Sequence, residues 1–126
     1  MRIVIQRVTN AKVEVDGKAV GSIGKGALVL FAVHKNDVPQ QTLWLANKLT
    51  QLRIFADADE KMNLSLLDIQ GEVLIVSQFT LYGNCSEGRR PAFTESAPPK
   101  MAIPKMIQES VFGKACAQNF DQVKPV

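Results

Sequence analysis

Apolar and polar side chains alternate at the start of the chain. Residues 2–8 place Ile3 and Ile5 on one side of an extended chain and polar residues on the other, a pattern that predicts a β-strand. Segments 12–15 and 18–23 look like strands on either side of Asp16-Gly17, a dipeptide typical of a two-residue turn. The sequence therefore predicts three early strands, of which the second and third form a hairpin.

Two runs of consecutive apolar residues follow, 27–33 and 73–76. Such runs are typical of strands that are covered on both faces. The second run continues into Ser77-Gln78-Phe79-Thr80, three polar side chains around one aromatic. Because a buried polar group must be hydrogen-bonded, this strand end either provides partners for those side chains or runs out into solvent.

One helix is predicted between the two apolar runs. Asp37 is expected to be its N-cap, and Pro39 suits its first turn. Leu43, Ala46 and Leu49 then share one apolar face. Trp44 lies beside that face and is expected to pack rather than to stack on a ligand.

The remaining segments are short or irregular. Residues 54–55 are expected to form a brief strand and residues 64–68 a short extended piece. Residues 83–99 form a long loop, and loops of that length in a compact domain are usually functional or disordered. Residues 99–109 can form a second helix, with Pro104 in its first turn or at a kink.

Strands dominate the early chain and helices are inserted between them, which indicates an α+β protein with a mostly antiparallel sheet and two helices. The length of 126 residues suits a single domain, 1–126, and 46% hydrophobic with 21% charged residues is typical of a globular protein. No apolar run approaches a membrane span and Met1 leads directly into a strand, so a cytoplasmic protein is expected. The net charge of +3 permits contact with RNA phosphate without requiring it.

The chain holds few residues typical of side-chain catalysis. His34 is its only histidine, and Cys85 and Cys116 are far apart, so no metal-ligand spacing is present and no metal or cofactor is expected. A Ser-His-acid triad would need His34 from a distant loop, where a solvated or hydrogen-bonded histidine is the commoner case. Thr80 could act as a nucleophile only beside a base, and a hydroxyl satisfied by backbone is an equally good interpretation.

Several motifs resemble, in order along the chain, those of the D-aminoacyl-tRNA deacylase family, formerly called D-tyrosyl-tRNA deacylases. The most specific is Ser77-Gln78-Phe79-Thr80-Leu81, followed downstream by Gly88-Arg89-Arg90-Pro91-Ala92-Phe93-Thr94. The other matching segments are 1–8, 13–17, 52–55, 61–66 and 97–99, so the resemblance covers about the first four-fifths of the chain.

The resemblance implies a barrel-like sheet that dimerises, with the active site at the subunit interface. It implies hydrolysis of the ester bond of D-aminoacyl-tRNA, with mischarged glycyl-tRNA as a further substrate, as a step of translation quality control. Because the ester is already activated, backbone N–H groups near Phe79 and Thr80 that stabilise an oxyanion could suffice, with the substrate's own ribose hydroxyl assisting.

The candidate catalytic residues are therefore Ser77, Gln78, Phe79 and Thr80, with Thr80 as an organiser of the site and a possible acid or base. Two further groups of residues are candidates for binding. Arg89 and Arg90 are expected to bind phosphates of the tRNA acceptor stem, although solvated arginines or a carboxylate pair across the dimer would look the same in sequence. Arg7 lies in a family-like context and is expected to border the substrate pocket.

The C-terminal part departs from the family pattern from about residue 105. The family carries an Asn-x-Gly-Pro-x-Thr motif whose Gly-Pro pair enters the partner's pocket and rejects L-amino acids. Here Lys124-Pro125 stands at about the expected distance beyond Phe112-Gly113, which leaves Pro125 as the substrate-binding candidate. A lysine in place of glycine adds a side chain where the backbone must approach a ligand closely.

This departure keeps two other interpretations open. One is a catalytically impaired tRNA-binding or dimerisation module that retained the first motif and lost the second. The other is an editing domain that acts on a mischarged L-amino acid, against which the absence of a fused synthetase argues.

Overall fold

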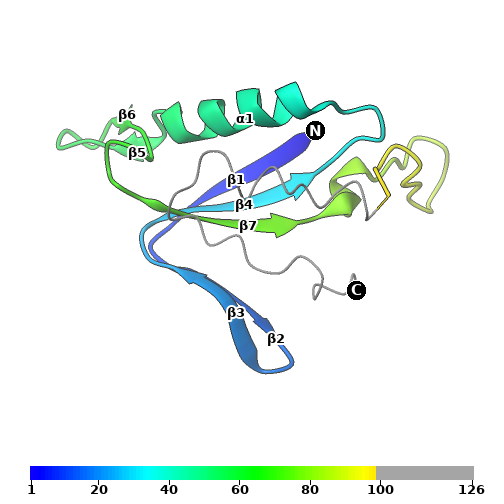
Figure 1. Ribbon diagram of the computed structural model, residues 1–126, viewed down its shortest axis with the longest axis horizontal. Helices are drawn as coiled ribbons and strands as arrows, with labels where there is room; N and C mark the ends of the chain where they lie inside the picture. The colour runs from blue at the N-terminus through cyan, green and yellow to red at the C-terminus, as the bar shows by residue number, and fades with distance from the viewer. Residues whose placement is uncertain (99–126) are drawn as a thin grey trace.

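The computed structural model describes residues 1–98 and centres on a three-stranded sheet (Figure 1). Its strands are β1 (Arg2–Val8), β4 (Gly26–Ala32) and β7 (Glu72–Ser77), in the order β1-β4-β7. Strand β4 pairs antiparallel with β1 and parallel with β7. The apolar run that follows Gly26 thus forms the central strand, as the sequence predicted.

The register brings three chain segments to one end of this sheet. Ile3 pairs with Phe31, and Phe31 pairs with Ser77. Strand β1 therefore begins where β4 and β7 end. This end of the sheet carries the polar sequence that follows β7.

Helix α1 (Pro39–Gln51) covers one face of the sheet (Figure 1). Thr42 and Leu49 are buried on its inner side, whereas Leu43 is 47% and Trp44 is 64% exposed. The expected packing of Leu43 and Trp44 is therefore wrong for residues 1–98. Thr42 and Leu49 are seven residues apart and therefore lie on the same side of the helix. On that side the Thr42 hydroxyl donates to the Met1 sulfur at 3.5 Å. The core beneath the helix contains Ala27, Val29, Phe31, Val33, Leu49, Phe55, Leu66, Val73, Ile75 and Ala97.

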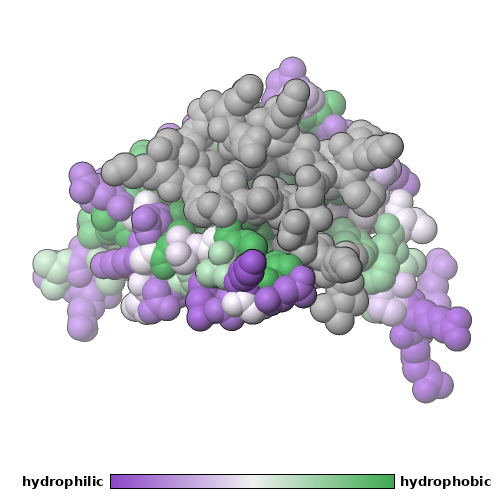
Figure 2. Space-filling model, turned by 60° about the horizontal axis from the view of Figure 1, so that its bottom comes forward, coloured by the Kyte–Doolittle hydropathy of each residue, from purple (hydrophilic) through white to green (hydrophobic). Residues whose placement is uncertain are grey.

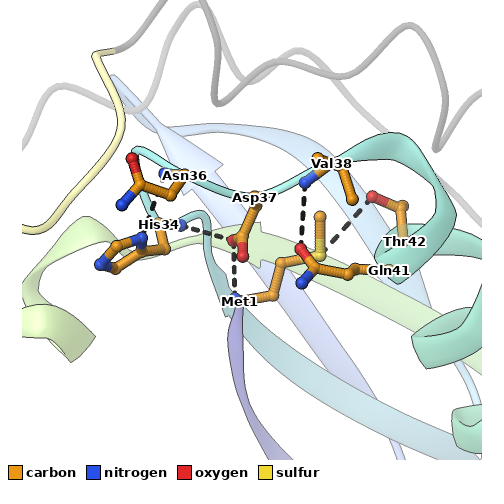
Figure 3. Close-up of polar contacts among 7 residues, drawn as sticks. All are labelled: Met1, His34, Asn36, Asp37, Val38, Gln41 and Thr42. Atoms are coloured by element: carbon orange, nitrogen blue, oxygen red, sulfur yellow. Dashed lines mark hydrogen bonds and ion pairs between the residues drawn. The ribbon is translucent and has the colours of Figure 1, made fainter.

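The start of α1 differs from the expectation. Val38 is the N-cap residue and Pro39 follows it, while the Gln41 side chain accepts a hydrogen bond from the Val38 N–H at 3.0 Å. The carboxylate of Asp37, the predicted N-cap, instead accepts the His34 N–H at 2.6 Å and pairs with the Met1 ammonium (Figure 3). The Asp37 carboxylate therefore pairs with Met1, which is distant in the sequence, and does not cap the helix as the local pattern predicted.

Two small hairpins complete the described fold. Strands β2 (Ala11–Val15) and β3 (Lys18–Ile23) pair as predicted and project from the sheet. The turn between them places Asp16 and Gly17 at φ 51° and 79°, which suits a type I′ turn.

Strands β5 (Phe55–Ala56) and β6 (Met62–Leu64) form the second hairpin. The expected extended piece at 64–68 is wrong beyond Leu64, because a turn follows. The Asp68 carboxylate accepts bonds from the Ser65 N–H and hydroxyl at 2.8 and 2.9 Å, which closes that turn. The Ser65 backbone bond, followed by the hydroxyl bond, lowers the pKa of Asp68.

The α+β class is confirmed, with one parallel pairing among otherwise antiparallel ones. Residues 1–98 do not form a closed barrel, and the second predicted helix, 99–109, lies outside the described residues. Over the described part of the chain, no helix is long and apolar enough to cross a membrane.

Candidate functional site

The predicted catalytic residues form a tight turn at the end of β7. The backbone N–H of Gln78 donates to the Phe31 carbonyl at 2.7 Å, which extends the ladder by one bond beyond Ser77. The chain then enters a short 3₁₀ helix, η1 (Phe79–Tyr82). Helix η1 contacts both β4 and β1, so it lies across the end of the sheet.

Within this turn, the side-chain amide of Gln78 donates a hydrogen bond to the hydroxyl oxygen of Thr80. That bond uses an acceptor position of the hydroxyl and leaves its proton available for another group. No basic side chain of residues 1–98 hydrogen-bonds to the Thr80 hydroxyl. The geometry of the described chain therefore supports an organising hydroxyl rather than an activated nucleophile.

The backbone N–H groups of Phe79 and Thr80 have no acceptor among residues 1–98. They stand at the start of η1, where the first N–H groups of a helix have no intrahelical partner. Both residues are exposed. The turn thus contains two adjacent N–H donors without an acceptor among residues 1–98, in the same turn as the Thr80 hydroxyl, as the oxyanion hypothesis requires.

Helix η1 is connected to the chain that follows it by aromatic and polar contacts. Phe79 and Phe93 pack edge to face, with centroids 5.3 Å apart and ring planes at 71°. The Ser96 hydroxyl donates to the Phe79 carbonyl at 3.0 Å. A Cβ atom at Gly83 would lie 3.1 Å from both the Phe93 ring and the Thr80 carbonyl. Small size at this position therefore permits close packing.

Arg89 and Arg90 lie in the loop next to η1. The loop is closed at its base by two hydrogen bonds of 2.9 Å between the backbones of Asn84 and Ala92. Both arginines are exposed, and neither forms an ion pair with a carboxylate of residues 1–98. The loop forms a hydrophilic protrusion at the same end of the molecule as η1 (Figure 2). The structure therefore places two cations, without an ion pair among residues 1–98, near the candidate catalytic turn.

Arg7 is not part of this cluster. It pairs with Ala27, which pairs with Val73, and so it lies at the opposite end of the sheet from Ser77. Its guanidinium donates to the Ile54 carbonyl at 3.0 Å. A substrate-binding role for Arg7 stays a prediction, and the other candidate, Pro125, lies outside the described residues.

His34 is held by local contacts and is not paired with Thr80. Its Nδ1 accepts the Asn36 N–H at 3.1 Å, as Figure 3 shows, and its ring meets Tyr82 edge-on at 5.4 Å between centroids. The prediction of a hydrogen-bonded loop histidine is confirmed. Residues 1–98 contain no cluster of three or more potential metal ligands.

Sequence reasoning missed the roles of Arg2, which contacts η1, and of Tyr82, the last residue of η1. The Arg2 guanidinium donates to the Leu81 carbonyl at 2.9 Å and lies 4.5 Å from the Tyr82 ring centroid. Burial is the main cause that raises the pKa of Tyr82, Asp37 adds to it, and the Arg2 charge opposes it. In the sequence Arg2 is only a polar position of an alternating strand, so no local signal identified it.

The chain is similar to known proteins along most of its length. A family model described as D-Tyr-tRNA(Tyr) deacylase matches residues 4–124. The D-aminoacyl-tRNA deacylase of Thermosipho africanus (strain TCF52B) is 60% identical over 116 residues, which are 92% of this chain and 76% of that protein. The protein of the same name from Geotalea uraniireducens (strain Rf4) is 60% identical over 114 residues, 90% of this chain and 72% of that one.

Two solved structures share the fold. One, described as c-Myc DNA Unwinding Element Binding Protein, has a TM-score of 0.75 and 36% identity and covers 80% of this chain and 68% of that chain. The other, described as a probable eukaryotic D-amino acid tRNA deacylase, has a TM-score of 0.66 over 79% of this chain and 59% of that chain, and its 20% identity supports the fold alone. With the family model and the 60% identical relatives, these matches establish that the chain belongs to the D-Tyr-tRNA(Tyr) deacylase family.

Proposed function

We propose that this protein hydrolyses the ester bond of D-aminoacyl-tRNA and releases free tRNA and the D-amino acid. Membership of the deacylase family supports the reaction and favours it over the impaired module. The observation that carries the proposal is the η1 turn, where the free N–H groups of Phe79 and Thr80 stand beside the Thr80 hydroxyl. Mischarged glycyl-tRNA is a further substrate of the same chemistry.

In this mechanism water adds to the ester carbonyl, and the negative charge that develops on the carbonyl oxygen is held by the two N–H groups. Preorganised donors of this kind contribute about 3–4 kcal/mol each to transition-state stabilisation. The Gln78 amide fixes the Thr80 hydroxyl, whose proton is free to donate to the same oxygen. The C–O bond to the ribose then breaks, and the departing ribose oxygen takes the proton that the added water gives up.

Ser77 ends the strand that holds the turn in place, the Gln78 N–H donates to the Phe31 carbonyl, and the Phe79 carbonyl accepts the Ser96 hydroxyl. The exposed pair Arg89 and Arg90 supports binding of the phosphates of the acceptor stem, because guanidinium groups suit phosphate geometry. We assign the enzyme to the cytoplasm, where its substrate arises, and to a homodimer with the site at the subunit interface, as the family resemblance implies.

The test is deacylation of D-Tyr-tRNA and L-Tyr-tRNA by the purified full chain. Hydrolysis of the D-ester alone is the expected result and would mean that Lys124-Pro125, or another element, replaces the Gly-Pro motif. Hydrolysis of both esters would support the catalytic turn and overturn the chiral selectivity. Hydrolysis of neither by a folded protein would overturn the proposal in favour of the impaired module.

A further inference from the structure

The C-terminal end of helix η1 is held by Arg2, a residue of strand β1. The Arg2 guanidinium donates to the Leu81 carbonyl at 2.9 Å, and it lies 4.5 Å from the centroid of the Tyr82 ring. A charged donor makes a stronger hydrogen bond than a neutral one, and a guanidinium over an aromatic face is attracted to the ring. One side chain thus contacts two consecutive residues of the helix that contains Phe79 and Thr80.

The backbone of Arg2 is itself fixed. Arg2 pairs with Ala32 in the sheet. Directly before it, the Met1 ammonium pairs with the Asp37 carboxylate at 2.6 Å, and both groups are only 8% exposed (Figure 3). The backbone from which the Arg2 side chain extends is therefore held by the ladder and, one residue before it, by a buried ion pair.

Arg2 provides a hydrogen-bond donor for the C-terminal end of η1. The last carbonyls of a helix have no intrahelical partner, and Arg2 satisfies that of Leu81. Tyr82 is 5% exposed and packs between the Arg2 guanidinium and the His34 ring. The position of the C-terminal end of η1 therefore depends on Arg2.

We propose that Arg2 is a positioning residue for the deacylation reaction, a role that rests on the proposed function. It touches no reacting atom. By holding Leu81 and Tyr82 it sets the direction of the Phe79 and Thr80 N–H groups at the other end of the same short helix. Misplacement of such donors by about 1 Å lowers the rate by about 100-fold.

Arg2→Met and Arg2→Lys test this role. Arg53 offers a matched control, because its guanidinium also donates to a backbone carbonyl, that of Asn63 at 2.8 Å, and it is exposed and outside the η1 cluster. Steady-state deacylation of D-Tyr-tRNA should show that Arg2→Met lowers kcat by about 10- to 100-fold while KM changes by less than about twofold. Arg2→Lys should recover part of kcat, and Arg53→Met should leave kcat unchanged.

Three results would overturn the proposal. Arg2→Met could retain the wild-type kcat, or it could lose activity only in proportion to a fall in Tm that Arg53→Met shares. A rise in KM with unchanged kcat and a flatter salt dependence would make Arg2 a phosphate ligand instead.

The amide NMR signals of Phe79 and Thr80 provide a readout that does not depend on turnover. They should shift in Arg2→Met and stay in place in Arg53→Met, and signals unmoved in both variants would overturn the positioning role. If the wild-type chain hydrolyses no D-Tyr-tRNA, the proposed function fails, and these amide signals still decide whether Arg2 sets the η1 backbone.

Discussion

The side-chain amide of Gln78 donates a hydrogen bond to the hydroxyl of Thr80, two residues further along the chain. This bond links the last extended residue after β7 to the first turn of η1. It holds the hydroxyl beside two backbone N–H groups that have no acceptor in the described part of the chain, and the hydroxyl proton remains to be donated.

Replacing Thr80 should therefore slow catalysis without unfolding the protein. A hydrogen bond to a developing charge is worth about 1.5–3 kcal/mol, so Thr80→Ala should lower kcat by about 10- to 100-fold. Thr80→Ser keeps the hydroxyl and should stay close to the wild-type rate. Single-turnover deacylation of D-Tyr-tRNA measures the difference, and wild-type turnover by Thr80→Ala would remove Thr80 from the site.

Removing Arg89 and Arg90 together should weaken tRNA binding. The double alanine variant loses two exposed cations of the loop beside η1. The slope of log K against log salt should fall by about 1 for each phosphate contact that is lost. A variant with Lys18→Ala and Lys61→Ala removes the same charge from other parts of the surface and is the control. Equal slopes of log K against log salt in the two variants would mean that the arginines are solvated loop residues.

Gly26→Ala should destabilise the sheet. A Cβ atom at Gly26 would overlap the Glu72 carbonyl oxygen and lie 2.7 Å from its carbonyl carbon, in the parallel pairing of β4 with β7. Overpacking of this kind costs about 1–3 kcal/mol of the free energy of unfolding. At Gly24 the same atom would meet only the Glu72 carboxylate, at 3.4 Å. Urea unfolding should therefore separate Gly26→Ala from a nearly neutral Gly24→Ala.

Asp37→Asn should destabilise the fold more than an exposed ion pair would predict. The variant leaves the buried Met1 ammonium without its counter-charge, and breaking a buried pair costs about 3–5 kcal/mol. The pair of Lys12 and Glu14 is 65% and 47% exposed, so Glu14→Gln should cost less than about 1 kcal/mol. Thermal unfolding compares the two variants, and similar losses would contradict a stabilising role for the Met1–Asp37 pair.

Tyr82 should titrate above its ordinary pKa of 10.0, because burial and, secondly, Asp37 raise the pKa of this phenol. The folded state holds the proton more tightly than the unfolded state, so stability is fully present below pH 10 and falls as the pH rises through the unfolded value. Tyr82 is the only tyrosine in the chain, so absorbance at alkaline pH reports it alone. Tyr82→Phe should remove this contribution to the alkaline loss of stability, and a midpoint at or below 10.0 would contradict the shift.

The sequence predicted the regular elements well where the signal was local. Asp16-Gly17 needs φ above zero at both positions, and the structure has that turn. The apolar run after Gly26 became the central strand because it can be covered on both faces. Of the predicted helix face, Leu49 is buried as expected but Leu43 is exposed, because Leu43 and Thr42 are adjacent and a rotation of α1 exchanges which of them is buried.

In the candidate site, too, contiguous sequence signals led to predictions, whereas contacts between distant residues could not be predicted. Residues 77–80 were predicted as the site from their resemblance to a family motif, which could be read because the motif is a contiguous segment. Arg2 and Arg7 could not be distinguished in that way, because both are arginines of one strand. The register decides that Arg2 contacts Leu81 and that Arg7 donates to Ile54 at the other end.

By itself, the sequence determined the main strands, the hairpin turn and the family, and it pointed to residues 77–80 as the candidate catalytic segment, since each depends on neighbouring residues. Only the tertiary structure decided that Asp37 pairs with Met1 rather than capping α1, and that Arg2 supports η1. These contacts join residues that are 36 and 79 positions apart, respectively, and only the packing of the sheet and helix brings their side chains together. Local sequence patterns do not predict contacts between residues so far apart in the chain, because their side chains meet only after the chain has folded.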